Sequence, residues 1–184
     1  MHLLSAQQAP SADVETAVDL GQSPAEIVLL SAADSELACL ARAHARLGAA
    51  APSLRLASLL RLGHPLSVDL YVDKVVAHAR LVVLRLLGGR SYWAYGLEQV
   101  AAACRERGIA LACLPGDDRP DPELDAFSTA PAELRRQLWR YLVEGGIGNA
   151  EQALRLMAGL PAQEPRPLPR AGLYHPARPR PDLG

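Results

Sequence analysis

The stretch Leu-Val-Val-Leu-Arg-Leu-Leu-Gly-Gly-Arg-Ser-Tyr-Trp-Ala-Tyr-Gly, residues 81–96, decides the fold of this chain. Its first seven residues are apolar except for Arg85, as in a strand that is buried on both faces of a sheet. The pair Gly88-Gly89 ends that run, and a helical pattern of apolar residues begins after Trp93. A buried strand, a glycine turn and a helix in this order are the repeating unit of a parallel α/β sheet, whose ligands bind beyond the carboxyl ends of the strands.

The same alternation recurs on both sides of this stretch. Apolar runs predict strands at 27–31, 54–60, 81–87 and 109–114, and helical spacing of apolar residues predicts helices at about 35–47, 66–79 and 94–107. Residues 1–6 suggest a further short edge strand. Because the joins are short and strands alternate with helices, we expect a doubly wound, flavodoxin-like parallel sheet of about four to five strands, in the α/β class.

The pattern changes near residue 129, after which only helical spacing is found. Two helices are expected before residue 160, the first ended by Gly145-Gly146 and the second capped by Asn149. Residues 161–184 contain seven prolines and no apolar period, so we expect them to be disordered when the chain is alone. The predicted organisation is a flavodoxin-like domain at 1–128, a helical extension at 129–160 and a Pro-rich linker or tail at 161–184.

Composition and charge restrict the cellular compartment and the classes of binding partner that we expect for this chain. A net charge of −1 creates no field that attracts nucleic acid or an anionic membrane. The sequence has no apolar stretch of membrane-spanning length, and at its N-terminus we expect no signal peptide, because no basic region is followed by a long apolar one. Its three cysteines, Cys39, Cys104 and Cys113, are far apart and form no CxxC, so we expect free thiols in a cytoplasmic protein.

The sequence offers no catalytic or metal-binding constellation. It has neither GxGxxG nor GxxxxGK[ST], so dinucleotide and P-loop sites lack their phosphate cradle, and no cofactor is expected in this piece. The five histidines are dispersed; His44 lies on the apolar stripe of its helix and is interpreted as a packing residue. Asp69 and Asp73 are four residues apart, and a solvated acidic face explains them better than a metal site, for which no third ligand is visible.

The candidate site is the edge at which the strands end. Glycine there admits a ligand or another backbone, Arg90 could pair with a carboxylate, and Tyr92 and Trp93 could pack on a ligand face. The alternative also stands: a tight Gly88-Gly89 turn, Trp93 in the core and Arg90 as a solvated charge. The candidate ligand-binding or docking residues are His64, Gly88, Gly89, Arg90, Ser91, Tyr92, Trp93, Asp117 and Asp118.

Several stretches, in order, resemble the N-terminal region of the cobaltochelatase large subunit, the CobN family, which is related to the large subunit of magnesium chelatase. They are Ile-Val-Leu-Leu-Ser-Ala-Ala-Asp-Ser-Glu-Leu (27–37), the run from Pro-Ser-Leu-Arg-Leu to Asp-Leu-Tyr-Val (52–72), Leu-Leu-Gly-Gly-Arg-Ser-Tyr-Trp-Ala-Tyr-Gly (86–96) and Leu-Pro-Gly-Asp-Asp-Arg-Pro (114–120). Residues 166–174 are similar to the family's join to its following domain.

The resemblance implies a role in aerobic cobalamin biosynthesis, a branch of tetrapyrrole (porphyrin-type) metabolism. There the enzyme, a ligase that forms nitrogen–metal bonds, inserts cobalt into hydrogenobyrinic acid a,c-diamide at the expense of ATP. Implied partners are the remainder of the large subunit, separate ATPase subunits that handle the nucleotide, and the tetrapyrrole. At 184 residues the chain is several-fold shorter than the family, so the resemblance implies an amino-terminal fragment, a split subunit or a truncated reading frame. The piece is expected to be inactive alone, and no catalytic residue can be carried over.

Two other interpretations remain open at the level of sequence. The chain could be a stand-alone flavodoxin-like binding or docking module without catalysis, because its polar residues form no pair of nucleophile and base. It could also come from the large subunit of a related magnesium chelatase.

Overall fold

The computed structural model describes residues 16–167 and contains a single sheet in that range. The predicted edge strand at 1–6 lies outside the described residues, as does the chain after residue 167. The strands are β1 (Ile27–Ser31), β2 (Leu54–Ser58), β3 (Leu81–Leu86) and β4 (Ala110–Pro115). The α-helices are α1 (Asp34–Leu47), α2 (Pro65–Lys74), α3 (Ala94–Arg107), α4 (Pro122–Phe127), α5 (Ala132–Glu144) and α6 (Gly146–Met157).

The four strands are parallel and lie in the order β2-β1-β3-β4. Ile27 of β1 is in register with both Leu54 and Leu81, and Leu81 is in register with Ala110. Every residue of β1 and β3 is buried, as the continuous apolar runs predict for strands covered on both faces. This is the strand order of flavodoxin-like doubly wound sheets, so the predicted fold class is confirmed.

The chain divides into two compact units. The first holds the sheet and comprises the residues through Ala32 together with Ser53–Thr129, and the second joins Ala33–Pro52 to the chain from Ala130 onward. The change of pattern near 129 therefore coincides with the start of helical structure in the second unit. This grouping differs from the sequence-based division because α1 belongs with α5 and α6. The predicted division into segments 1–128, 129–160 and 161–184 stays a prediction.

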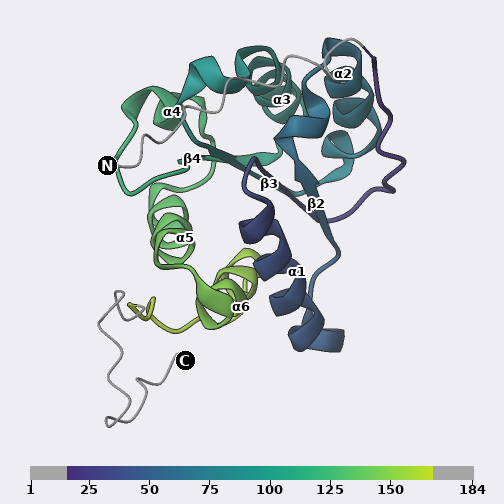
Figure 1. Ribbon diagram of the computed structural model, residues 1–184. Coiled ribbons are helices and arrows are strands. Elements are labelled where there is room, and N and C mark those ends of the chain that lie inside the picture. Colours follow the sequence, from purple (N-terminus) through teal and green to yellow (C-terminus); the bar gives the residue numbers. More distant parts are fainter. Residues whose placement is uncertain (1–15, 168–184) are drawn as a thin grey trace, which may run out of the picture. The chain divides into compact units, whose positions relative to one another are not determined.

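In the first unit, α2 and α3 lie side by side against the sheet (Figure 1). One core cluster joins Val28 and Leu30 of β1, Val82 and Leu84 of β3, and residues of both helices. Tyr71 of α2 is buried and donates its hydroxyl to the Oε1 of Gln22 at 2.9 Å, because a buried phenol requires a hydrogen-bond partner. Burial also raises the pKa of Tyr71 well above its ordinary value.

In the second unit, α6 packs against both α1 and α5. Leu40 and Ala43 of α1 are buried, as are Leu138 of α5 and Leu154 of α6. The Nε2 of His44 lies 2.8 Å from the carbonyl oxygen of Pro52, so His44 is the packing histidine that the sequence indicates. No helix within residues 16–167 is both long and apolar enough to span a bilayer.

Several element boundaries differ from the predictions. β2 ends at Ser58 because Leu59–Leu62 form a 3-10 turn that buries Leu59 and Leu62. Likewise α2 ends at Lys74, and a 3-10 turn at Val76–His78 follows it. In both places apolar residues remain buried although the backbone changes, so apolar spacing alone could not place the boundary.

Two helices also begin at positions that the sequence did not predict. α4 was not expected, yet the side chain of Asp121 caps it and Pro122 occupies its first turn. α6 begins at Gly146 rather than after Asn149, so Asn149 is not its cap. The Nδ2 of Asn149 instead donates to the carbonyl oxygen of Gly145 at 2.8 Å, which satisfies a carbonyl at the end of α5.

Candidate pocket at the carboxyl edge of the sheet

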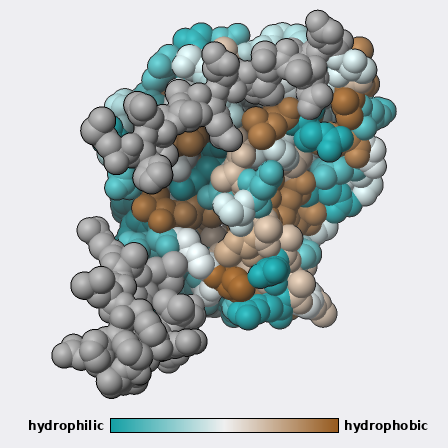
Figure 2. Space-filling view, in the orientation of Figure 1, coloured by the Kyte–Doolittle hydropathy of each residue, from teal (hydrophilic) through white to brown (hydrophobic). Residues whose placement is uncertain are grey.

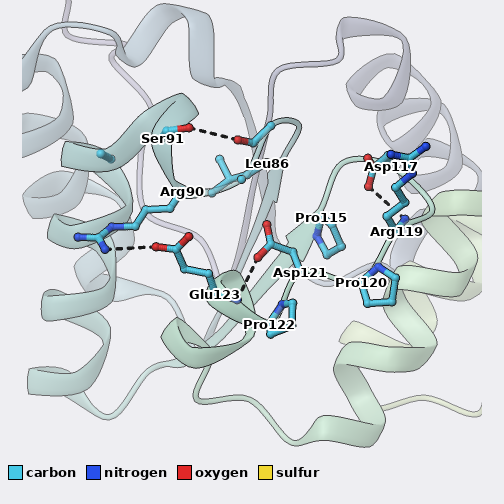
Figure 3. Close-up of a pocket in the computed structure, with 13 residues that line it drawn as sticks. Leu86, Arg90, Ser91, Pro115, Asp117, Arg119, Pro120, Asp121, Pro122 and Glu123 are labelled. Carbon is cyan, nitrogen blue, oxygen red and sulfur yellow. Dashed lines mark hydrogen bonds and ion pairs between the residues drawn. The ribbon is translucent and has the colours of Figure 1, made fainter.

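A pocket of about 660 Å³ opens in the first unit, where β3 and β4 end (Figure 3). One wall is the join between β3 and α3, and the other is the join between β4 and α4. This is the edge that the sequence predicts for ligand or partner binding. The lining residues are Leu86, Gly88, Gly89, Arg90, Ser91, Ala94, Pro115, Asp117, Arg119, Pro120, Asp121, Pro122 and Glu123.

The first wall begins with the glycine turn. Gly88 and Gly89 have φ of 95° and 71°, in the left-handed region that side chains disfavour. A Cβ on Gly89 would lie 3.0 Å from the Oδ2 of Asp121 on the other wall, so glycine also allows the two joins to approach. The hydroxyl of Ser91 faces back toward the Gly88 carbonyl oxygen at 3.4 Å (Figure 3).

A buried guanidinium connects β3 to the end of β4 and the join that follows it. Arg85 of β3 is only 6% exposed and donates to the carbonyl oxygens of Pro115 at 2.8 Å and Gly116 at 3.2 Å. A buried charge is tolerated only where hydrogen bonds replace water. Gly116 in turn lies so close to Leu87 that a Cβ would come within 2.7 Å of its backbone. In the sequence Arg85 interrupts an apolar run, and a lone charge in a buried strand indicates such a role.

Arg90 is held by groups of this chain. Its guanidinium donates to Glu98 at 2.7 Å and to Glu123 at 3.3 Å, and its Cζ lies 5.6 Å from the centroid of the Phe127 ring. The hydrogen bonds that Arg90 donates to Glu98 and Glu123 raise the pKa of Arg90 above its ordinary value. Figure 3 shows the Arg90 side chain directed toward Glu123, so this arginine crosslinks α3 and α4.

The second wall is built from Asx-type hydrogen bonds. The Oδ1 of Asp121 accepts from the backbone of Glu123 and of Leu124, both at 3.0 Å, and thereby starts α4. The Oδ1 of Asp117 accepts from the backbone of Arg119 at 3.1 Å. Asp121 and Glu123 are not among the predicted site residues, yet an aspartate followed by proline is the pattern of a helix start.

The structure brings some of the predicted site residues together and separates others. Gly88, Gly89, Arg90, Ser91 and Asp117 line the pocket, whereas His64, Tyr92, Trp93 and Asp118 do not.

Two of the residues outside the pocket have structural roles. His64 caps α2, since its Nδ1 accepts from the backbone of Leu66 at 3.1 Å. Trp93 is 8% exposed, donates its indole N–H to the Leu62 carbonyl oxygen at 2.8 Å and packs on Gly96. The core interpretation of Trp93 is therefore the right one.

The pocket is lined by ionisable groups of both signs. Its ionisable groups are Arg90 and Arg119 against Asp117, Asp121 and Glu123, and none of them forms a pair of nucleophile and base. Within residues 16–167 no group of three or more His, Cys, Asp or Glu side chains is placed to hold a metal ion. Asp69, one of the acidic pair noted in the sequence, accepts a hydrogen bond from the Tyr95 hydroxyl at 2.7 Å.

Two further features are the state of the cysteines and the polarity of the surface on one face. All three cysteines are free, and Cys104 and Cys113 are buried. On the face that Figure 2 shows, hydrophobic patches alternate with hydrophilic ones.

The chain is similar to known cobaltochelatase subunits, although no family model matches it. It is 49% identical over 181 residues to an aerobic cobaltochelatase subunit CobN of Sinorhizobium sp and 46% identical over 182 residues to one of Pseudomonas aeruginosa. Each match covers 96% of this chain, which spans about 14% of the length of these curated relatives. Among solved structures, the catalytic subunit of cobaltochelatase from Mycobacterium tuberculosis matches with a TM-score of 0.62 and 29% identity, over 89% of this chain and 12% of the other. By sequence over nearly its whole length and by fold, the chain resembles a part of the CobN cobaltochelatase subunits.

Proposed function

We propose that this chain acts as part of a cobaltochelatase large subunit, which inserts cobalt into hydrogenobyrinic acid a,c-diamide at the expense of ATP during aerobic cobalamin biosynthesis. The observation that carries this proposal is the 49% identity over 181 residues to an aerobic cobaltochelatase subunit. Because the chain spans about 14% of that relative, we assign metal insertion to the remainder of the subunit and ATP hydrolysis to separate ATPase subunits. This piece alone is proposed to be inactive.

We assign the pocket edge to docking against the remainder of the subunit, ahead of direct contact with the tetrapyrrole. The support is the state of Arg90, whose charge is already offset by Glu98 and Glu123. A carboxylate of the tetrapyrrole would have to displace two carboxylates of the chain. A partner segment can instead fill the open pocket and leave those ion pairs in place.

The activity is tested with cobalt, ATP, the ATPase subunits and hydrogenobyrinic acid a,c-diamide. We expect metallated product from a complete subunit that carries this sequence, and none above a no-protein blank from the 184-residue chain alone. A complete subunit from which the matching region has been deleted should lose activity. Product from the chain alone would refute its inactivity, and full activity after deletion would refute the need for this region.

The role of the edge is tested in the complete subunit with Arg90→Ala and Tyr92→Ala, both of which change exposed side chains. Arg105→Ala, an exposed arginine in the last turn of α3, is the matched control. If the edge docks the remainder of the subunit, the pocket loops are better protected from hydrogen exchange in the complete subunit than in the 184-residue chain, and fluorescence quenching by the tetrapyrrole is unchanged in Arg90→Ala and Tyr92→Ala. Loss of tetrapyrrole affinity in Arg90→Ala, but not in Arg105→Ala, would assign the edge to the substrate instead.

A further inference from the structure

Residues 161–167, which we call the strap, follow α6 and contain neither helix nor strand. They were expected to be disordered together with the rest of the Pro-rich tail. Instead, side chains of α5 and α6 hold the strap through its backbone. The Oε1 of Gln152 accepts from the backbone N–H of Gln163 at 2.8 Å, and the Tyr141 hydroxyl donates to the Gln163 carbonyl oxygen. Both backbone polar groups of Gln163 are thus satisfied by side chains of two helices.

Asn149 binds a second residue of the strap in the same two-sided way. Its Nδ2 donates to the carbonyl oxygen of Arg166 at 2.7 Å, and its Oδ1 accepts from the N–H of Arg166 at 2.9 Å. The amide of Asn149 therefore pairs with a backbone as a neighbouring strand would. Asn149 is only 4% exposed, so these hydrogen bonds form away from water, where an unpaired amide would be costly.

The two strap residues that are bound through both backbone groups are three apart, and so are its two half-buried residues. The paired residues, Gln163 and Arg166, are three apart. Ala162 and Pro165, also three apart, are half-buried, and the other five strap residues are exposed. A period of three is that of the polyproline II helix, which has no internal hydrogen bonds and leaves its backbone free for recognition.

The sequence of the strap favours that conformation. Pro161, Pro165 and Pro167 each fix φ near −65°. Glu164 and Arg166 each precede a proline, which disfavours the helical region for them. Little chain entropy is therefore lost when the strap is bound, because most of its residues are already restricted in the unbound chain.

We propose that the paired surface of α5 and α6, centred on Tyr141, Asn149 and Gln152, is a receptor for an extended polyproline II segment. Its occupant is the strap of the same chain. The receptor binds backbone groups of Gln163 and Arg166, and Arg155 of α6 donates to the Pro161 carbonyl oxygen at 3.1 Å. It requires little of the side chains, apart from the exposed ion pair of Arg140 with Glu164 at 3.1 Å. Residues 161–167 thus form an ordered attachment of the chain to the helical unit rather than the beginning of a free linker. This inference does not depend on the proposed chelatase role.

The test is residue-level hydrogen exchange of the Gln163 and Arg166 amides in the 184-residue chain. Asn149→Asp keeps the size of the side chain but removes both donations by Nδ2 and places a carboxylate oxygen against the carbonyl oxygen of Arg166, which repels the strap. We expect exchange at Arg166 to accelerate at least about tenfold. Arg166→Ala is the matched control, because it preserves the backbone groups that Asn149 binds, and should leave exchange at Gln163 and Arg166 within about twofold of the parent.

A second variant distinguishes release of the strap from local unfolding of the helices, which Asn149→Asp could also cause because Asn149 bonds to Gly145. Gln152→Ala removes only the acceptor for Gln163 and should accelerate exchange of that amide, with the amides inside α5 unchanged. Unchanged exchange in both Asn149→Asp and Gln152→Ala would overturn the proposal. Release of the strap in Arg166→Ala as large as in Asn149→Asp would also overturn it, because recognition would then rest on the side chain.

Discussion

At the scale of single residues, some glycines of this structure lie so close to neighbouring atoms that a methyl group would not fit. Gly96 in the first turn of α3 is the sharpest case, since a Cβ there would lie 2.0 Å from the ring of Trp93. Gly148 occupies the same place in α6, as the third residue of its helix, but has no atom within 4 Å of a Cβ position. The same residue type thus has opposite consequences at two equivalent helical positions.

We therefore expect Gly96→Ala and Gly148→Ala to change stability in opposite directions. Gly96→Ala must displace the Trp93 ring and should lower the free energy of unfolding by about 1–3 kcal/mol, as overpacking does. Gly148→Ala should raise it by about 0.5–1 kcal/mol, because alanine favours the helix. Urea unfolding followed by tryptophan fluorescence and by circular dichroism measures both. Equal effects of the two variants would contradict the close packing of Trp93 on Gly96.

The thiols also respond to their surroundings. Burial raises the pKa of Cys104 from 9.0 to about 12, so the neutral thiol is favoured in the folded chain. Its contribution to stability is complete below about pH 9 and is lost as the pH rises through about 12. At about pH 8 we expect iodoacetamide to modify the half-buried Cys39 first, with Cys104 and Cys113 modified only after unfolding. Mass spectrometry of the labelled peptides decides this, and early modification of Cys104 would show that its burial is transient.

At the scale of elements, the pocket depends on the short helix α4. This helix has six residues, too few to be stable by itself, and its start relies on the side chain of Asp121. Glu123, in its first turn, carries one of the two ion pairs of Arg90. The shape of the second wall is therefore tied to a single capping residue.

Replacing Asp121 by alanine should weaken that wall. Two backbone N–H groups of α4 would lose their acceptor, and we expect a loss of about 1 kcal/mol in the free energy of unfolding. Hydrogen exchange in Pro122–Phe127 should accelerate more than in β4. Asp118→Ala, an exposed change in the same loop, is the control and should alter neither quantity. An unaltered exchange rate in α4 would mean that tertiary contacts alone maintain the helix.

At the scale of the whole molecule, α1 connects two strands of the sheet in sequence but groups by contacts with α5 and α6. The helical unit is therefore discontinuous, and most of it follows residue 129. A chain ended at residue 128, where the sequence suggests a domain boundary, would leave α1 without the helix α6 on which it packs.

We predict that such a shortened chain has a poorly protected α1. Amides of Asp34–Leu47 should exchange faster in the chain ended at residue 128 than in the 184-residue chain, while those of β3 remain protected. The reason is that a helix of this length is marginal in water without an apolar partner. Hydrogen exchange by mass spectrometry compares the two chains. Equal protection of α1 would show that residues 1–128 complete their own fold.

The sequence by itself determined the parallel α/β class, the four central strands, and the edge at which the pocket opens. It could do so because apolar period, glycine and proline act over a few neighbouring residues. The tertiary structure decided which residues of that edge meet. Trp93 belongs to the core because Gly96 leaves space for its ring, and Arg90 belongs to an ion-pair network because α4 brings Glu123 to it. The grouping of α1 with α5 and α6, and the capture of Gln163 and Arg166 by Asn149 and Gln152, depend on contacts between residues distant in sequence, which no local pattern encodes.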